Sequence, residues 1–180
     1  MTALNTLAGT RETRPEAGEH APYYARYTTL VPDGDVVERL VAQFPATLQF
    51  LRSLGEEGGG RRYSPDKWSV RQVVGHLADT ERVFTYRALR FARSDSTNLP
   101  GFDENNFVAN ARFDARTLAG LCDEFEAVRA ATVAFFSNLD AEEWGRRGVA
   151  NNNGMSVRAA AWIIAGHELH HVDVVRTRYL

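Results

Sequence analysis

Apolar residues recur at helical spacing in four long segments, which together predict four helices. The first helix covers residues 36–54, where Asp35 and Glu38 have the spacing of a capping box. Pro45 lies inside this segment and predicts a kink or a division, because proline removes a hydrogen bond from the helix ladder. The apolar face of this helix consists of Val36, Val37, Leu40, Val41, Phe44, Leu48 and Leu51.

The second predicted helix begins after Ser69, an N-cap residue with Gln72 three positions later. Trp68 is placed to pack against Val73, and helix-favouring residues continue to about Phe91. A run of three glycines at positions 58–60 is expected to break the chain before this helix.

The third predicted helix occupies residues 117–138, and Ser156 caps a last helix that runs nearly to the C-terminus. A short turn at residues 140–144 and a loop at 151–154 lie between them. No segment alternates apolar and polar residues for long enough to predict a strand.

Four helices with apolar faces predict an all-α protein, an antiparallel four-helix bundle. Residues 94–116 lack periodicity and form a long loop between helices two and three, rich in turn-forming residues and aromatic side chains. Residues 1–20 are expected to be too polar to be buried and to form a flexible tail. We expect residues 21–180 to form a single domain.

The composition is that of a soluble globular protein, with 44% hydrophobic and 24% charged residues. The 21 basic and 23 acidic residues are well mixed, so no surface for nucleic acid or an anionic membrane is indicated, and small molecules are the expected partners. A single cysteine, Cys122, excludes an internal disulfide and suits a reducing compartment. Neither a secretory signal nor a membrane span is evident, so we expect a cytoplasmic protein.

Histidines occupy positions that face the core on two of the helices. His167 and His171 are four residues apart, which places their imidazoles about 40° apart on the apolar face of the last helix. His76 lies on the flank of the apolar stripe of the second helix. One such histidine alone is usually a hydrogen-bonded core residue, but three together favour a metal site. His170 points about 60° away from His167, on the side opposite to His171. We expect it either to donate a hydrogen bond to a ligand or to lie on the surface.

An all-histidine site without thiolate suits zinc, nickel or another late first-row ion, and three protein ligands leave a position open for water or substrate. Gly75 and Gly166 directly precede two of the histidines. A glycine inside a helix costs about 1 kcal/mol relative to alanine, so close approach of the two helices is the expected reason. Glu81 is expected either to orient His76 or to pair with an arginine such as Arg87.

The two histidine helices share a short echo. Ser69-Val70-Arg71 leads to Gly75-His76, and Ser156-Val157-Arg158 leads to Gly166-His167, with about one extra helical turn in the second copy. This pattern indicates that the two helices bring histidines to a common depth in the bundle.

Residues 167–171 also match the zinc-protease pattern H-E-x-x-H, in which the glutamate, here Glu168, acts as general base. Such enzymes take a third ligand downstream, yet only nine residues follow His171 and none fits well. We therefore regard a protease as the less favoured interpretation. Glu168 and His171 also form one Glu-x-x-His pair as in di-iron bundles, but the second copy those sites need is missing.

The chain resembles the DinB/YfiT-like family of metal-dependent bundle proteins. The resemblance lies in residues 67–81 (KWSVRQVVGHLADTE), in the loop 99–104 (LPGFDE) and in the ending 165–171 (AGHELHH). It implies a four-helix bundle, often dimeric, with a metal held by His76, His167 and His171. It also implies one of two kinds of activity. One is that of a transferase or isomerase that uses a low-molecular-weight thiol, and the other is that of a metal-dependent hydrolase.

The leading hypothesis is a metal-dependent enzyme of thiol S-transferase or hydrolase type that acts on a small electrophilic substrate, as a homodimer. Glu168, Asp103 and Glu104 are candidate general bases, and the sequence does not choose among them. One alternative is a non-catalytic, stress-associated or ligand-sequestering bundle in which the metal stabilises the fold. Another is a partner-binding surface built on aromatic residues, which are Phe102, Phe107, Tyr23, Tyr24 and Tyr27.

Overall fold

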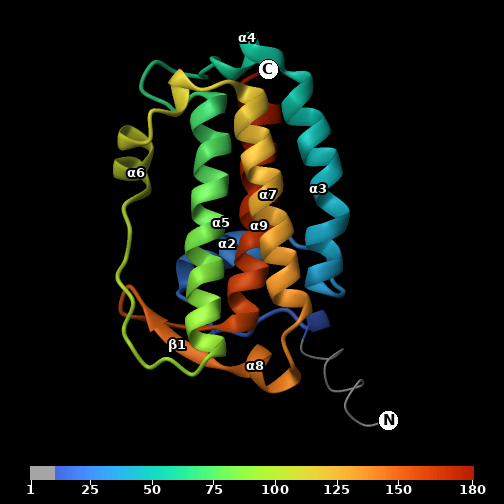
Figure 1. The fold of residues 1–180 in the computed structure, drawn as a ribbon, viewed down its shortest axis with the longest axis vertical. Helices are drawn as coiled ribbons and strands as arrows, with labels where there is room; N and C mark the ends of the chain where they lie inside the picture. Colours follow the sequence, from blue (N-terminus) through green and yellow to red (C-terminus); the bar gives the residue numbers. More distant parts are fainter. Residues whose placement is uncertain (1–10) are drawn as a thin grey trace.

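The structure, a computed structural model, describes residues 11–180 of the chain. Four long helices form its bundle (Figure 1). The outer pair in sequence, α3 and α9, runs in one direction, and the inner pair, α5 and α7, runs in the opposite direction (Figure 1). The predicted all-α four-helix bundle is confirmed. The bounds are α3 (Val36–Ser53), α5 (Val70–Ala92), α7 (Leu118–Ser137) and α9 (Val157–Arg178).

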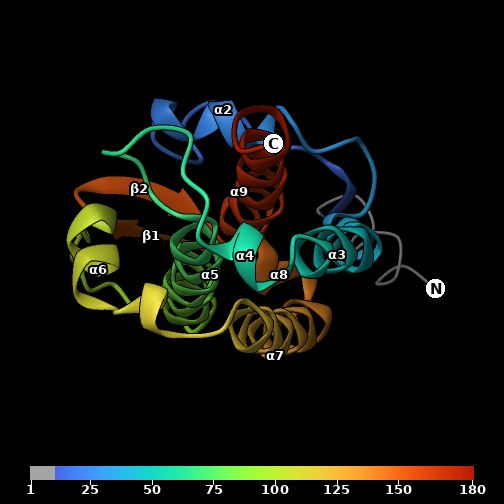
Figure 2. The ribbon, with the colours of Figure 1, turned by 90° about the horizontal axis from the view of Figure 1, so that it is seen from above.

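Viewed down the bundle, α5 packs between α7 and α9, and α3 closes the square (Figure 2). Because α5 and α7 are parallel, the chain between them must return along the whole length of the bundle. This requirement explains the long connection that the sequence predicts. The connection carries α6 (Glu104–Asn110) and the 3-10 turn η2 (Phe113–Ala115), both packed against α5.

Several short elements close the two ends and one side of the bundle. The three glycines at 58–60 do not simply interrupt the chain, because α4 includes two of them. The short helix α2 packs on α9 beside the histidine helices (Figure 2). These elements are η1 (Pro22–Tyr24), α2 (Ala25–Thr28), α4 (Gly55–Gly59), α8 (Ala141–Gly145), β1 (Arg147–Ala150) and β2 (Asn153–Ser156).

The expectation that the chain has no strand is wrong for the segment before α9. Strands β1 and β2 pair as an antiparallel hairpin. Asn151 and Asn152 at its tip both have positive φ, 52° and 59°. Two consecutive left-handed residues make the tight turn that matches the twist of a hairpin, and asparagine tolerates that conformation. The strands have four residues each, too few for a clear alternation of apolar and polar positions. Only the asparagines of the turn could have indicated a hairpin in the sequence.

The predicted helix starts are largely confirmed. Ser69 and Gln72 form the complete capping box of α5. Asp35 caps α3 by accepting hydrogen bonds from the backbone N–H groups of Val37 and Glu38. Of the two outcomes predicted for Pro45, a kink or a division of the first helix, the division is wrong, because α3 continues through this residue. Pro45 lies on the exposed face of α3, where water can satisfy the carbonyl that loses its partner.

The polar segment before the bundle is partly tied to it. The expectation that it is too polar to be buried is wrong for Glu19, which is 4% exposed. The Glu19 carboxylate accepts hydrogen bonds from Ser156 at 2.7 Å and from Arg158 at the start of α9. Residues 1–10 lie outside the described residues, so the flexible tail stays a prediction there.

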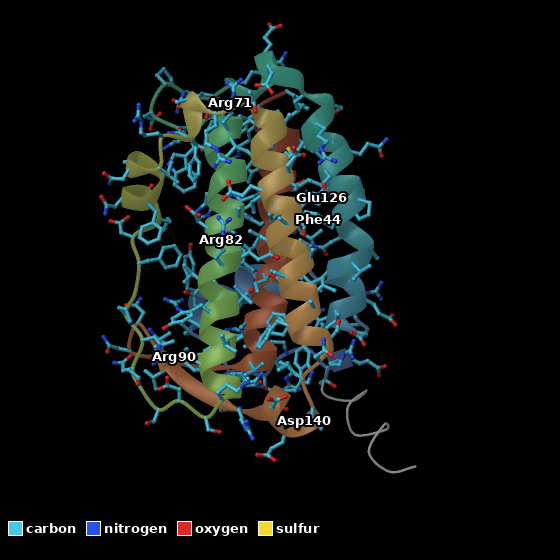
Figure 3. The ribbon with its side chains drawn as sticks, in the orientation of Figure 1. Phe44, Arg71, Arg82, Arg90, Glu126 and Asp140 are labelled. Carbon is cyan, nitrogen blue, oxygen red and sulfur yellow. The ribbon has the colours of Figure 1, made fainter. Side chains whose placement is uncertain are left out.

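The core consists of two apolar clusters, one towards each end of the bundle. In the cluster near α4, Phe44 of α3 packs edge to face against Phe125 of α7, with ring centroids 4.9 Å apart (Figure 3). Charged side chains such as Arg82 and Glu126 lie on the outer faces of the helices (Figure 3). Among residues 11–180, no helix has the length and apolar character needed to cross a membrane.

Candidate metal centre

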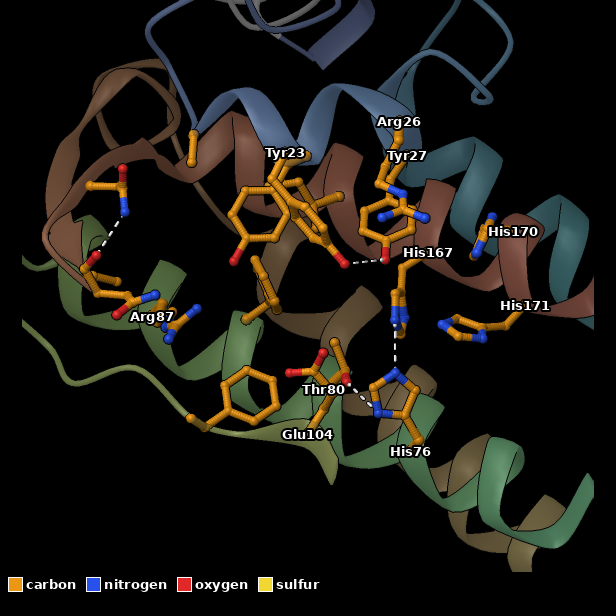
Figure 4. Close-up of a pocket in the computed structure, with 18 of the residues that line it drawn as sticks. Tyr23, Arg26, Tyr27, His76, Thr80, Arg87, Glu104, His167, His170 and His171 are labelled. Atoms are coloured by element: carbon orange, nitrogen blue, oxygen red, sulfur yellow. Dashed lines mark hydrogen bonds between the residues drawn. The ribbon is translucent and has the colours of Figure 1, made fainter. Parts of the chain in front are cut away.

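Three histidines from α5 and α9 meet inside the bundle. The donor nitrogens of His76, His167 and His171 all lie within 4.8 Å of one another. The Nε2 atoms of His76 and His167 are 3.0 Å apart (Figure 4). The ring centroids of His167 and His171 are 4.4 Å apart, as expected for residues four positions apart on one helix face. The residues that the sequence selects are therefore brought together.

Two glycines make room for this arrangement, although not by the contact that the sequence suggested. A Cβ on Gly166 would lie 2.0 Å from the backbone oxygen of Tyr27, so α2 can sit on α9 only because this position is glycine. A Cβ on Gly75 would lie 2.4 Å from the ring of Phe113 in η2. The expected packing role is real, but the close partners are α2 and η2 rather than α5 and α9 against each other.

Burial keeps all three imidazoles neutral. Desolvation lowers the pKa of His76 to about 4 and lowers the pKa of His167 and His171 well below the ordinary histidine value. Charge repulsion from His171 and His76 further lowers the pKa of His167, and repulsion from His76 further lowers that of His171, because imidazolium cations so close would repel each other. Neutral imidazole is the form that offers a lone pair to a metal ion.

Residues around the cluster fix the orientation of the rings. Thr80, one turn after His76, has its Oγ1 3.3 Å from His76 Nδ1. When Nδ1–H donates to this hydroxyl, the lone pair of Nε2 faces the other histidines. The ring of Trp68 packs on His76 with centroids 4.8 Å apart, and the ring of Tyr27 packs edge-on against His167 at 5.2 Å.

The donor set fits one late first-row divalent ion. Three neutral nitrogen donors converge, and small side-chain rotations would bring them within reach of a single ion. His170 is not part of the cluster. It is half-buried, and its ring contacts Tyr27 and His171, with centroids 5.4 and 5.0 Å away. This position agrees with the phase argument that excluded it as a ligand.

The glutamate between the histidines faces away from them. Glu168 is 1% exposed, and its carboxylate accepts hydrogen bonds from Thr47 at 2.5 Å, from Gln43 at 2.7 Å and from Arg129 Nη1 at 2.7 Å. All of its partners come from α3 and α7, on the far side of α9 from α2. A carboxylate held in this way is not placed to take a proton from a nucleophile at the histidines. The H-E-x-x-H match therefore lacks the geometry of a zinc protease, and Glu168 is not the general base.

Of the two expectations for Glu81, an ion pair with an arginine is confirmed and a contact with His76 is wrong. Its two carboxylate oxygens accept from Arg129 at 2.9 and 2.7 Å, so the partner is Arg129 rather than Arg87. Arg129 thus joins Glu81 of α5 to Glu168 of α9 in a buried ion-paired network. Spacing within one helix did not reveal this network, because its members lie on four different helices.

A cavity of about 490 Å³ opens beside the histidines (Figure 4). Glu104 of α6 lines it and is half-buried, whereas the carboxylate of Asp103 accepts hydrogen bonds from the first backbone N–H groups of α6. Of the three candidate bases, only Glu104 faces the cavity. The cavity wall also includes most of the aromatic residues that the sequence offered as a partner surface, namely Tyr23, Tyr24, Tyr27 and Phe102.

The sequence assigned no chemical role to the hydroxyl groups of the cavity tyrosines. The hydroxyl groups of Tyr23 and Tyr27 are 3.3 Å apart, beside His167 (Figure 4). Burial raises the pKa of Tyr27 far above its ordinary value, and burial also raises that of Tyr24. Both phenols keep their protons at neutral pH and can donate hydrogen bonds. Cys122, by contrast, is buried in the core, where desolvation raises the pKa of its thiol to about 11, so it is not a nucleophile.

Comparison with known proteins identifies the family of this chain. Residues 39–175 match the model of the DinB superfamily. The chain belongs to the DinB superfamily. A protein of Oceanobacillus iheyensis, whose name proposes a metal-dependent hydrolase activity, is 27% identical over 128 residues, which cover 70% of this chain and 73% of that protein.

Two solved structures share the fold. YfiT from Bacillus subtilis, proposed to be a metal-dependent hydrolase with an unusual four-helix-bundle topology, superposes with a TM-score of 0.65 at 18% identity, over 96% of this chain and 97% of that one. The mycothiol-dependent maleylpyruvate isomerase superposes with a TM-score of 0.61 at 14% identity, over 81% of this chain and 62% of that one. At such low identity these likenesses establish the fold alone.

Proposed function

We propose that this protein is a metal-dependent enzyme that adds a water or thiol nucleophile to a small electrophilic substrate, with His76, His167 and His171 as the metal ligands. The observation that carries the proposal is the opening of the three-histidine cluster into a cavity. A purely structural ion is usually enclosed by four protein ligands, whereas a reactive ion keeps a position free. Among the residues that the structure describes, the cluster has three members.

A divalent ion held by three neutral imidazoles supplies Lewis-acid chemistry, which makes a nucleophile available near neutral pH. The chain supplies the remaining requirements. Thr80 and Trp68 hold the ring of His76 in place. The aromatic walls of the cavity exclude water from an apolar substrate and strengthen the hydrogen bonds made inside.

Two residues of the cavity are assigned to the reaction, Glu104 to proton transfer and Tyr27 to hydrogen bonding. Glu104 accepts the proton that the water or thiol loses as its oxygen or sulfur forms the new bond to the electrophilic carbon. The bond from that carbon to the leaving group then breaks, and the group departs as halide or as an aryl oxide that takes the proton from Glu104. The hydroxyl of Tyr27 donates a hydrogen bond to the negative charge that develops on the substrate, in the way of an oxyanion-hole donor. The high pKa of Tyr27 suits it to a hydrogen-bonding role rather than to that of a base.

Both hydrolysis and thiol transfer use this arrangement, and they differ only in the nucleophile. The name of the Oceanobacillus relative favours hydrolysis, and the mycothiol-dependent isomerase favours a thiol. The experiment is to load the purified protein with zinc or nickel and to supply a reactive aryl ester or an aryl halide, with and without cysteine as the thiol. Mass spectrometry then identifies either the hydrolysed product or the thiol adduct, which is a thioester from the aryl ester and a thioether from the aryl halide.

We expect the metal-loaded protein to accelerate one of these reactions and the chelated protein to do neither. Glu104→Gln should lower kcat by about 10²–10⁴-fold, the range for loss of a general base. Glu126→Gln, at an exposed carboxylate on α7, is the matched control and should leave kcat unchanged. Equal rates with and without metal would refute the proposed function, and an unaltered kcat in Glu104→Gln would refute the role of Glu104.

A further inference from the structure

A second feature of the cavity is a buried arginine at the end away from the histidines. Arg87 follows His76 by eleven residues on α5, which is three turns, so the two side chains share one helix face with their Cα atoms about 16 Å apart. Arg87 lines the same cavity as the histidine cluster (Figure 4). It is 3% exposed.

The partners of Arg87 are all neutral. One terminal nitrogen of its guanidinium donates to the backbone carbonyl of Pro100 at 3.1 Å. The group lies over the rings of Phe84 and Phe102, 5.2 and 5.7 Å from their centroids. Burial lowers the pKa of Arg87, and the phenol of Tyr24 is the neighbour that counteracts this effect. Arginine nevertheless stays charged, so a cation is held in the wall without a counter-charge.

The other fully buried arginine shows what this chain does when the charge is structural. Arg129 is also 3% exposed, yet it has two carboxylates within hydrogen-bonding distance. Among residues 11–180, Arg87 forms no ion pair with any carboxylate. A buried charge without an opposite charge is strongly unfavourable. A ligand with a negative charge would remove this unfavourable free energy when it binds. An unpaired buried arginine in a cavity wall therefore favours the binding of an anion.

We propose that Arg87 binds a carboxylate group of the molecule that enters the cavity, and thereby holds its other end at the histidine cluster. The orientation towards the histidines rests on the proposed function, whereas the recognition of the carboxylate does not. A single planar guanidinium matches one carboxylate through two parallel hydrogen bonds, and it carries one compensating charge. The rings of Phe84 and Phe102 beside it suit an apolar body attached to that carboxylate.

The test compares two ligands of equal size that differ in charge. Hexanoate and hexanamide are titrated into the full-length protein by isothermal titration calorimetry, with the wild type, Arg87→Met, Arg87→Lys and Arg82→Met. We expect the wild type to bind hexanoate about tenfold to hundredfold more tightly than hexanamide, the range for a hydrogen bond to a charged group. Arg87→Met should remove this preference, and Arg87→Lys should retain part of it. Arg82 is a half-exposed arginine of α5 that pairs with Asp79 and Glu124, so Arg82→Met should keep the full preference for hexanoate.

Binding of hexanoate to any ion at the histidines would be the same in the wild type and in Arg87→Met, so the comparison isolates Arg87. Removal of an unpaired buried charge should leave the Tm of Arg87→Met equal to or above that of the wild type, which shows that the variant is folded. The proposal is overturned if the wild type does not distinguish the two ligands, or if Arg87→Met prefers hexanoate as strongly as the wild type does. If hexanoate binds as expected but neither the aryl ester nor the aryl halide is turned over, the proposed function fails and the role of Arg87 in binding a carboxylate stands.

Discussion

Arg129 of α7 and Glu168 of α9 form an ion pair in the middle of the bundle, with 2.7 Å between Nη1 and Oε2. Glu168 directly follows His167, so its neighbour in sequence points to the histidine cluster while its own side chain points to α7 and α3. The same helix therefore contributes two histidines to the candidate metal centre on one face and a carboxylate to a buried ion-paired network on the other.

Replacement of Arg129 should destabilise the fold. Arg129→Met leaves Glu81 and Glu168 as buried carboxylates without a counter-charge, and we expect a loss of about 3–5 kcal/mol in the free energy of unfolding. Urea unfolding followed by circular dichroism measures it. Arg82→Met is the control, because its ion pairs are solvent-accessible and should contribute less than about 1 kcal/mol. Equal losses in the two variants would show that the buried network does not stabilise the protein.

Metal binding should depend on His171 and not on its neighbour. His171→Ala removes one of the three proposed ligands, so the purified variant should lose its metal while its helix content stays the same. His170→Ala changes the adjacent ring, which lies outside the cluster, and should keep the metal content of the wild type. Elemental analysis gives the metal content of both. One ion per chain in His171→Ala would contradict the ligand assignment.

A methyl group at Gly166 should disturb the wall of the site. Gly166→Ala gains up to about 1 kcal/mol in helix propensity, but its Cβ would lie 2.0 Å from the backbone oxygen of Tyr27, which cannot rotate away. We expect overpacking to exceed the gain and to lower the free energy of unfolding by about 1–3 kcal/mol. Gly145→Ala is the control, since nothing lies within 4 Å of its added Cβ. An unchanged or raised Tm in Gly166→Ala would disprove the close approach of α2.

The contact of Glu19 with α9 should make stability depend on pH. The pKa of Glu19 is lowered from 4.5; burial acts to raise it, but hydrogen bonds from Arg158, the Glu16 backbone and Ser156 outweigh burial. A carboxylate with a lowered pKa stabilises the fold above its unfolded pKa, and this contribution is lost as the pH falls through the folded value. Glu19→Gln should therefore cost about 1–3 kcal/mol at pH 7.

The difference between Glu19→Gln and the wild type should shrink as the pH falls below 4.5, because the wild-type carboxyl then becomes protonated. Urea unfolding at a series of pH values measures this difference. Glu16→Gln changes an exposed carboxylate three residues earlier and should behave as the wild type throughout. A cost for Glu19→Gln that does not change with pH would contradict the proposed charge interaction.

Local sequence determined the helices and the histidine faces. Ser69 and Gln72 fix the start of α5 by mutual hydrogen bonds, and the four-residue spacing of His167 and His171 fixes their common face. These features depend only on residues within one or two helical turns, so they can be predicted from the chain itself. The echo between the two histidine segments also indicated the common depth that the 3.0 Å contact of His76 and His167 now shows.

Only the tertiary structure decided which polar residues serve the site. Glu168 lies beside a candidate ligand in sequence, yet its carboxylate is bound by side chains of α3 and α7. Glu104 lies in the long connection between α5 and α7, and the fold of this connection places it at the cavity. Arg87 and Arg129 are equally buried and are indistinguishable by composition. They differ in their partners, because Arg129 contacts two carboxylates from other helices and Arg87 contacts none within the described part of the chain. These contacts depend on how the helices pack, which no local sequence pattern determines.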